Sequence, residues 1–340
     1  KKKRLNADTP ELESAEGSEK KVAKRHESTG DYTSGVGRGR GVGRGRGRAD
    51  GCGRGSRIEV ASSRPSALRM LKPKCGRSHT LSVAVPASIV ENAQNGELKA
   101  LLVGQIARAV TIFGVDEVVI YEDRSNVPWS KDDETWSRSM AFMTRNLQYL
   151  ETPQYLRKQL LPMHADLKWV GLLNPLDAPH HLRKKEWLAY REGVVLASDS
   201  APAPLVEGRG CWLNCGLDDF VWVGGQVIPE GVRVTVRMDE STSNEGPYRG
   251  TAVAPHEPRT KMGLYWGYQT RPASSLKAVF DECPFEGGYD MTIGTSERGE
   301  PLGLSKVPKY NHLLIAFGGL GGFEEVIADE LSGYNAGKDP

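Results

Sequence analysis

Residues 288–322 of this 340-residue chain read GYDMTIGTSERGEPLGLSKVPKYNHLLIAFGGLGG. Two short apolar runs lie in this stretch, Asp290–Ile293 and Leu313–Phe317, and each stops abruptly at a polar or glycine-rich loop. Apolar runs of this length that are bounded by glycine are typical of buried strands in an α/β sheet. Ligands of such sheets bind in the crevice beyond the carboxyl ends of the strands. The stretch therefore predicts two neighbouring strands with a ligand site at their ends.

The two loops that follow these strands differ in chemistry. Gly294–Gly299 reads GTSERG and carries hydroxyl groups and charges, whereas Gly318–Gly322 reads GGLGG and has almost no side chains. Glycine allows backbone N–H and C=O groups to approach a flat ligand closely. We therefore expect one loop to supply functional side chains and the other to supply backbone contacts.

The motif pair GTSERG and FGG, about twenty residues apart, resembles the SPOUT class of RNA methyltransferases, in particular the eukaryotic and archaeal branch with an inserted OB-like domain. The similarity continues upstream through LSVAVPASIVENAQ, QIARAVTIFGVDEVVIYED and RTKMGLYWGYQTR, and it covers roughly residues 78–328. The resemblance implies an α/β fold with a SPOUT-like parallel sheet and an inserted small β-barrel. It also implies S-adenosyl-L-methionine as cofactor, RNA as substrate, a homodimer with the active site at its interface, and no metal in the methyl transfer.

Members of this family continue past FGG into a further strand, a Gln-Gly-Ser-Arg-like loop and a final helix, which complete a trefoil knot and the cofactor pocket. The sequence in hand ends at Pro340 without this knot-forming part, so the sequence leads us to expect weak cofactor binding. The expected function is base-directed methylation of ribosomal or other structured RNA. A second class of function stays open, namely a catalytically inactive adaptor that associates with RNA, chromosomes or the spindle.

The resemblance also implies which residues form the site. The expected cofactor-binding residues lie in the two strand-end loops: Thr295, Ser296, Glu297, Arg298, Gly299, Phe317, Gly318 and Gly319. Arg298 is the expected catalytic residue, and it would orient the target phosphate or polarise the base. A structural pairing of Glu297 with Arg298 is an open alternative for the glutamate.

The N-terminal segment, residues 1–77, has the composition of a disordered basic arm. Residues 1–78 hold 20 Lys+Arg and 9 Asp+Glu, a net charge of +11, whereas residues 79–340 hold 25 and 34, a net charge of −9. Arginines alternate with glycines between Gly35 and Gly55, and such segments bind nucleic acid with little sequence preference. The arm residues that we expect to contact RNA are Arg38, Arg40, Arg44 and Arg46. A solvated tail without a partner is the alternative.

The folded part is expected to contain three segments: residues 78–193 as the first part of the α/β domain, 194–271 as the barrel, and 272–340 as the cofactor-loop part. Leu81–Pro86, Ala87–Phe113 and Val118–Tyr121 read as a strand–helix–strand unit, which implies parallel pairing of the two strands. A second helix is predicted for Glu134–Leu150. Glu122 and Asp123 end the second strand; we expect solvated acids there, with a substrate contact as the alternative.

Residues 194–271 change to short alternating strands, which suit a small barrel. The predicted strands are Val194–Leu196, Cys211–Asn214, Val221–Val223, Val232–Val236 and Leu264–Thr270. Arg233 and Arg237 alternate with valines, so we expect a basic strand face that contacts RNA. Tyr265, Trp266 and Tyr268 could stack on bases or pack between the barrel and the sheet.

The remaining features restrict metal, redox and membrane functions. The five cysteines form no CxxC motif, and Cys211 and Cys215 have no His or Cys pair nearby, so we expect reduced thiols and no zinc site. His180 and His181 are adjacent and would point to opposite faces of a strand, which argues against a metal site. No apolar run reaches the ~18 residues of a membrane span, and no signal peptide is visible. We expect an intracellular protein in the nucleus, the nucleolus or the cytoplasm.

Overall fold

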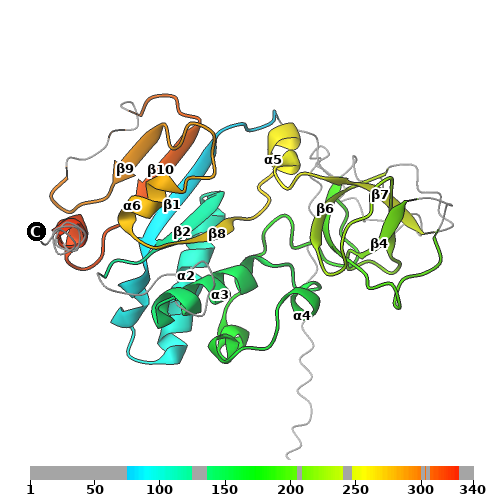
Figure 1. Ribbon diagram of the computed structural model, residues 1–340, viewed down its shortest axis with the longest axis horizontal. Helices are drawn as coiled ribbons and strands as arrows, with labels where there is room; N and C mark the ends of the chain where they lie inside the picture. The colour runs from blue at the N-terminus through cyan, green and yellow to red at the C-terminus, as the bar shows by residue number, and fades with distance from the viewer. Residues whose placement is uncertain are drawn as a thin grey trace, which may run out of the picture. The chain divides into compact units, whose positions relative to one another are not determined.

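A computed structural model describes residues 75–124, 136–204, 209–239, 247–299, 303 and 307–328 of the chain. Residues 1–74 of the predicted disordered arm, with Arg38, Arg40, Arg44 and Arg46, lie outside these residues. The predicted end of the arm at residue 77 is wrong, because Arg77 pairs with Asp116 at 2.7 Å and belongs to the folded part. The described part contains a parallel sheet with helices on its faces and a closed β-barrel (Figure 1). This confirms the predicted fold class of an α/β sheet with an inserted barrel.

The parallel sheet has the strand order β8-β2-β1-β10-β9. All four neighbouring pairs are parallel, and residues such as Val83 pair with Val118 on one side and with Ile315 on the other. The predicted parallel pairing of the first two strands is therefore confirmed, and so is the neighbourhood of the two strands in residues 288–322. The strands are β1 (Thr80–Pro86), β2 (Glu117–Tyr121), β8 (Gln269–Ala273), β9 (Met291–Gly294) and β10 (His312–Ala316).

Helices cover both faces of this sheet, because alternate strand residues point to opposite faces. Val118 and Ile120 pack with α2 (Gly96–Ile112) and α3 (Arg138–Glu151) in one core cluster. Val119 and Tyr121 pack on the other face with α6 (Leu276–Asp281) and with Phe323 and Val326, which lie in a helical turn over residues 322–328. β2 is buried along its whole length, as a strand between two helix layers must be.

The first predicted helix is in fact two elements. A 3-10 helix, η1 (Ala87–Asn92), is followed by α2, which begins after Asn95. The Asn95 side chain accepts a hydrogen bond from the N–H of Leu98 at 2.9 Å and so caps the helix. Likewise, Ser137 caps α3 by accepting from the N–H of Met140. The predicted start of α3 near residue 134 lies outside the described residues.

The barrel closes through the order β3-β4-β5-β7-β6. Its strands pair antiparallel, except that β5 and β7 are parallel. Leu213, Val221 and Val236 are almost fully buried in its interior. The strands are β3 (Tyr190–Val195), β4 (Gly210–Asn214), β5 (Val221–Gly224), β6 (Arg233–Met238) and β7 (Tyr248–Val253). The barrel is thus inserted in the chain between β2 and β8 of the parallel sheet.

The predicted fifth barrel strand, Leu264–Thr270, is wrong. Residues 269–273 form β8 of the parallel sheet, and the true fifth strand is β7. The sequence of β7 shows no clear apolar alternation, because a glycine, Gly250, stands at an inward position. A Cβ there would lie 2.5 Å from Cγ1 of Val236. Close packing of two strands therefore required glycine at that place, and glycine weakened the strand signal.

The other short elements connect these two parts. They are α4 (Arg157–Leu160), η3 (Ala165–Leu167), η4 (Val170–Leu172) and α5 (Glu257–Met262). Within the described residues, no helix combines the length and the apolar character that crossing a membrane would need.

Candidate active site

The candidate site lies at the carboxyl ends of β9 and β10. These strands run in parallel, with Leu313 opposite Met291 and Ala316 opposite Gly294, so both end at the same edge of the sheet. The loops that follow them are therefore neighbours in space, as the sequence predicted. Ligands of parallel sheets bind at this edge.

The loop after β9 is fastened to the end of β10. Thr295 donates two hydrogen bonds to the carbonyl oxygen of Ala316, from its N–H at 2.9 Å and from its Oγ1 at 3.2 Å. Further along, Ser296 organises the turn: its Oγ accepts from the N–H of Arg298 at 3.2 Å, and its carbonyl accepts from the N–H of Gly299 at 3.2 Å. The side chains of Glu297 and Arg298 are exposed. The loop backbone is thus fixed while its two charged side chains remain free to meet a ligand.

The loop after β10 folds back on itself. The N–H of Gly322 donates to the carbonyl of Gly319 at 3.0 Å, and Gly322 has a φ of +77°, a conformation that favours glycine. A Cβ on Gly318 would lie 3.0 Å from the carbonyl carbon of Gly322 and 3.1 Å from the amide nitrogen of Phe323. A side chain at position 318 would therefore require the backbone of Gly322 and Phe323 to shift by a few tenths of an ångström.

Between the two loops is a cleft of about 910 Å³. Six of the expected cofactor-binding residues line it: Thr295, Ser296, Glu297, Arg298, Gly318 and Gly319. Gly299 and Phe317 do not line it, although each adjoins a residue that does. The lining residues that the sequence did not single out are Leu320, Gly321, Gly322, Phe323, Glu324 and Ile327.

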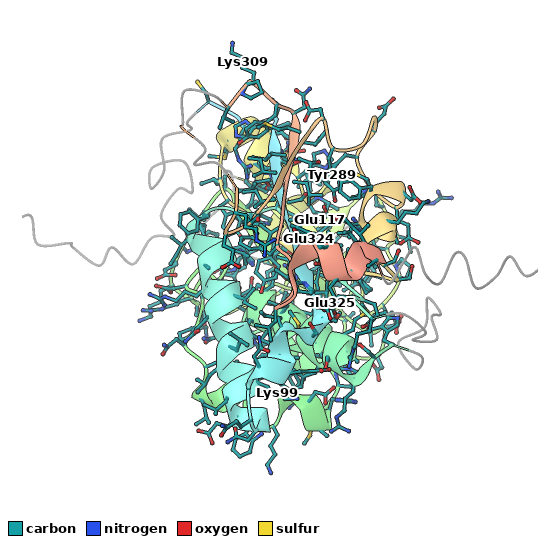
Figure 2. All side chains as sticks on the ribbon, turned by 90° about the vertical axis from the view of Figure 1, so that its left-hand side faces the viewer. Lys99, Glu117, Tyr289, Lys309, Glu324 and Glu325 are labelled. Carbon is teal, nitrogen blue, oxygen red and sulfur yellow. The ribbon has the colours of Figure 1, made fainter. Side chains whose placement is uncertain are left out.

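Most of these additional residues belong to the helical turn that follows the glycines. Figure 2 shows Glu324 and Glu325 beside this turn. A Cβ on Gly322 would lie 2.6 Å from Oε2 of Glu324, so the carboxylate folds back over the glycine. The cleft thus presents two carboxylates, Glu324 and Glu297, and one guanidinium, Arg298. No sequence motif marked this contact, because it depends on how the chain turns after Gly322.

The glycine loop is supported from behind by the end of β2. The fully buried Tyr121 donates from its hydroxyl to the carbonyl of Phe317 at 2.7 Å. Asp123 lies against the loop, because a Cβ on Gly319 would be 3.3 Å from its Oδ2. Ser88, which follows β1, donates from its N–H to Oδ1 of Asp123 at 3.1 Å and from its Oγ to Oδ2. Four strand ends therefore build the site. The sequence had indicated those of β9 and β10, and at the end of β2 it left a substrate contact by Glu122 or Asp123 open. Glu122, expected to be solvated, is buried instead.

The structure places Arg233 differently from the open basic face that the sequence suggested. Its guanidinium donates to both oxygens of Glu151, at 2.6 and 2.9 Å, and through Nε to Glu192 at 2.7 Å. Burial alone would lower the pKa of Arg233, but the two carboxylates raise it. Arg233 therefore joins the barrel to α3 and has no free guanidinium for RNA. Arg237 is 44% exposed and donates to Glu257 at 3.0 Å, so its contact with RNA stays a prediction.

The aromatic residues before β8 pack inside the molecule. Trp266 donates from Nε1 to Glu192 at 2.6 Å, and the hydroxyl of Tyr268 donates to the carbonyl of Leu147 at 2.9 Å. Both rings are buried, and burial also raises the pKa of the neighbouring Tyr265 above its ordinary value. Of the two roles left open by the sequence, packing is therefore the one that the structure has.

The adjacent histidines also have a structural role, but the expectation that they point to opposite faces of a strand is wrong, because they lie at a turn and both face the same carbonyl group. The Nε2 atoms of His180 and His181 lie 2.9 and 2.6 Å from the carbonyl oxygen of Glu151. Burial, with the neighbouring His180, lowers the pKa of His181 to about 4. Across the described ranges, no three His, Cys, Asp or Glu side chains gather in a way that could hold a metal ion. Cys211 and Cys215 are free and buried, and burial raises the pKa of Cys215 to about 12.

Comparison with known proteins points to one family of RNA methyltransferases. Residues 80–339 match the family described as "Putative RNA methyltransferase". The chain is 47% identical over 258 residues to a mouse protein and 46% identical over 255 residues to a human protein, both named "28S rRNA (uridine-N(3))-methyltransferase". These matches cover 74% and 73% of this chain and 66% of each relative. A Caenorhabditis elegans protein named "Putative methyltransferase spot-1" is 36% identical over 280 residues, which are 76% of this chain and 72% of that protein.

Proposed function

This chain belongs to the "Putative RNA methyltransferase" family, and we propose that its strand-end cleft binds S-adenosyl-L-methionine for methyl transfer to RNA. The chain spans about two thirds of the length of its mouse and human relatives. The observation that carries the proposal is the cleft itself, because two family motifs that lie apart in sequence line one cavity at the ligand edge of the sheet.

The residues of the cleft suit this cofactor. Gly318 and Gly319 expose backbone where a flat adenine needs close approach, and Thr295 and Ser296 add hydroxyl groups beside it. Glu297 and Glu324 supply carboxylates, which can accept hydrogen bonds from ribose hydroxyls and from an ammonium group. When bound, S-adenosyl-L-methionine supplies a methyl group on a positively charged sulfur. The chain's own residues then have to hold the RNA atom in line and exclude water.

The target that we propose is N3 of a uridine in large-subunit ribosomal RNA, the reaction named for the mouse and human relatives. Arg298 lines the cleft with an exposed side chain, so it can reach an RNA phosphate or the base. Arg237 on the barrel and the arginines of the arm would hold flanking RNA through phosphate contacts. Nothing in the comparisons favours the alternative of an inactive adaptor.

We further propose a homodimer that acts in the nucleus, the nucleolus or the cytoplasm, where ribosomal RNA is made and used. Apolar side chains are exposed beside the cleft, with Leu320 90% and Ile327 47% exposed, and Phe317 42%. A second copy that covered them would remove this surface from water. Sedimentation equilibrium measures the mass; a monomer at micromolar concentration would contradict the dimer.

The experiment that tests the proposed function has two readouts. Calorimetric titration measures binding of S-adenosyl-L-methionine, and transfer of a radiolabelled methyl group to a 28S rRNA transcript measures activity. Reverse transcription then locates the modified base, because a methyl group on N3 blocks the pairing edge of uracil. We expect saturable binding and an arrest at a uridine. No binding at millimolar cofactor together with no transfer would reject the proposal.

A further inference from the structure

One carboxylate lies behind the glycine loop without being part of the cleft lining. Asp123 follows β2, and its Oδ2 is 3.3 Å from the place where Gly319 would carry a Cβ. Gly319 itself lines the cleft. Asp123 therefore adjoins Gly319 at the edge of the cleft and is half-buried, so a target base that extended past Gly319 would meet its carboxylate.

Asp123 is held in one orientation by a single neighbour. Ser88 donates its N–H to Oδ1 at 3.1 Å and its hydroxyl to Oδ2. Each carboxylate oxygen keeps a lone pair, and both residues are only half-buried. The two carboxylates of the cleft, Glu297 and Glu324, are exposed and hydrogen-bond no other described residue. Asp123 is thus the pre-oriented acceptor near the loop.

Arg124 is the cation next to Asp123 in the chain. This guanidinium lies 2.9 Å from Glu91 and 3.5 Å from Glu122. Burial alone would lower the pKa of Arg124, but the surrounding carboxylates, Asp123 included, raise it. Within the described residues, Glu91 and Glu122 share this cation, and it makes no ion pair within 4 Å with Asp123. Asp123 therefore remains available as an acceptor.

The proposed reaction needs such an acceptor. N3 of uracil carries a hydrogen, and its nitrogen lone pair is delocalised into the two flanking carbonyl groups. The nitrogen becomes a useful nucleophile once this proton is removed, and a positioned carboxylate within hydrogen-bond reach is a suitable general base.

We propose that Asp123 accepts the N3 proton of the target base, an inference that rests on the function proposed above. The N–H bond breaks, and its proton passes to a carboxylate oxygen of Asp123. The electron pair left on N3 forms the new bond to the methyl carbon, while the electron pair of the carbon–sulfur bond remains with sulfur. Ser88 acts as a positioning residue for the carboxylate.

The first test is Asp123→Asn, which keeps the shape and an oxygen that can accept from Ser88. We expect single-turnover methyl transfer to fall at least ~100-fold, within the usual contribution of a general base. Cofactor affinity by calorimetry and RNA affinity by filter binding should stay within about twofold. The matched control is Asp281→Asn on α6, an exposed carboxylate outside the cleft, which should transfer at the wild-type rate.

The second test separates proton transfer from simple positioning. A 5-fluorouridine at the target has a more acidic N3–H. It should therefore raise the transfer rate of Asp123→Asn strongly and the transfer rate of the wild type only slightly. The residual rate of the variant should also rise about tenfold per pH unit, because hydroxide then takes the proton. A transfer rate within threefold of wild type, a loss explained by weaker cofactor binding, or no rescue by 5-fluorouridine would each overturn the proposal. A wild-type chain that neither binds nor transfers would instead reject the proposed function.

Discussion

Replacement of Arg233 by methionine should strongly destabilise the fold. Arg233 pairs with Glu151 at 2.6 Å and with Glu192 at 2.7 Å, and these carboxylates expose only 10% and 3% of their side chains. Methionine would leave two buried carboxylates without their cation. Removal of one partner from a buried ion pair costs about 3–5 kcal/mol, so we expect Arg233→Met to lower the free energy of unfolding by about 4 kcal/mol.

Two further variants test whether this loss of unfolding free energy is specific to the buried ion pairs of Arg233. Arg237→Met changes the same residue type on the same strand, but Arg237 is 44% exposed, so its loss should cost less than about 1 kcal/mol. Glu151→Gln leaves Arg233 paired with Glu192 and should cost about 2 kcal/mol. The double variant Glu151→Gln with Arg233→Met should lose about 1–2 kcal/mol less unfolding free energy than the sum of the two single variants, because each single change leaves the other partner without its counterpart.

Urea denaturation followed by tryptophan fluorescence measures these differences. With a denaturant dependence of about 2 kcal/mol per molar, 4 kcal/mol moves the midpoint by about 2 M. Midpoints of Arg233→Met and Arg237→Met within about 0.5 M of each other would refute the reasoning. Such a result would also return Arg233 to the set of RNA-contact candidates.

The pH dependence follows from the same contacts. Burial alone would raise the pKa of Glu151, but Arg233 and His180 lower it in the folded protein. A lowered folded-state pKa contributes stability that is complete above the unfolded carboxyl value of about 4.3 and is lost as the pH falls from there toward the folded value. The stability difference between wild type and Arg233→Met should therefore shrink in acid. A difference that stays constant from pH 7 to pH 3 would contradict this assignment.

Four further predictions concern the cleft and the arm. Gly318→Val should weaken cofactor binding at least ~10-fold, about 1.4 kcal/mol, because its Cβ presses on the backbone of the loop; unchanged calorimetric affinity would reject the pocket. Arg298→Ala should lower methyl transfer ~10- to 100-fold with cofactor affinity unchanged, and equal losses in both would place Arg298 on the cofactor. Tyr121→Phe should cost about 1–2 kcal/mol in urea unfolding, since the carbonyl of Phe317 loses its buried donor; no change would show that the hydroxyl does not hold the loop. Deletion of residues 1–74 should flatten the salt dependence of RNA binding by up to about 4 in log–log slope, and an unchanged slope would show that the arm makes no phosphate contacts.

The sequence predicted the sheet well because its signals are local. Short apolar runs that end at glycine, such as those of β9 and β10, reveal a buried strand and its end without knowledge of the partner. The same locality explains the errors. β7 was not predicted because Gly250 interrupts its apolar pattern, and the glycine is needed there only because the side chain of Val236 on another strand packs against it. The break before α2 depends on the hydrogen bond by which Asn95 caps that helix.

Part of the site could be predicted, because the motifs GTSERG and FGG follow strands whose ends must lie at one edge of a parallel sheet. The roles of these residues toward cofactor and RNA stay predictions. The contribution of the helical turn with Glu324 could not be foreseen, since it depends on how the chain turns after Gly322. Arg233 was misassigned because an alternating basic strand face looks the same in sequence whether solvent or a carboxylate faces it.

By itself, the sequence determined the α/β architecture, the presence of a barrel and the two loops that line the cleft. Only the tertiary structure decided which distant residues meet. Arg233 and Glu151 are 82 residues apart, Ser88 and Asp123 are 35 apart, and Tyr121 and Phe317 are 196 apart. Periodicity and turn chemistry act over a few neighbouring residues, whereas a hydrogen bond or an ion pair depends on position in space, which the packing of the two helix layers and the barrel fixes.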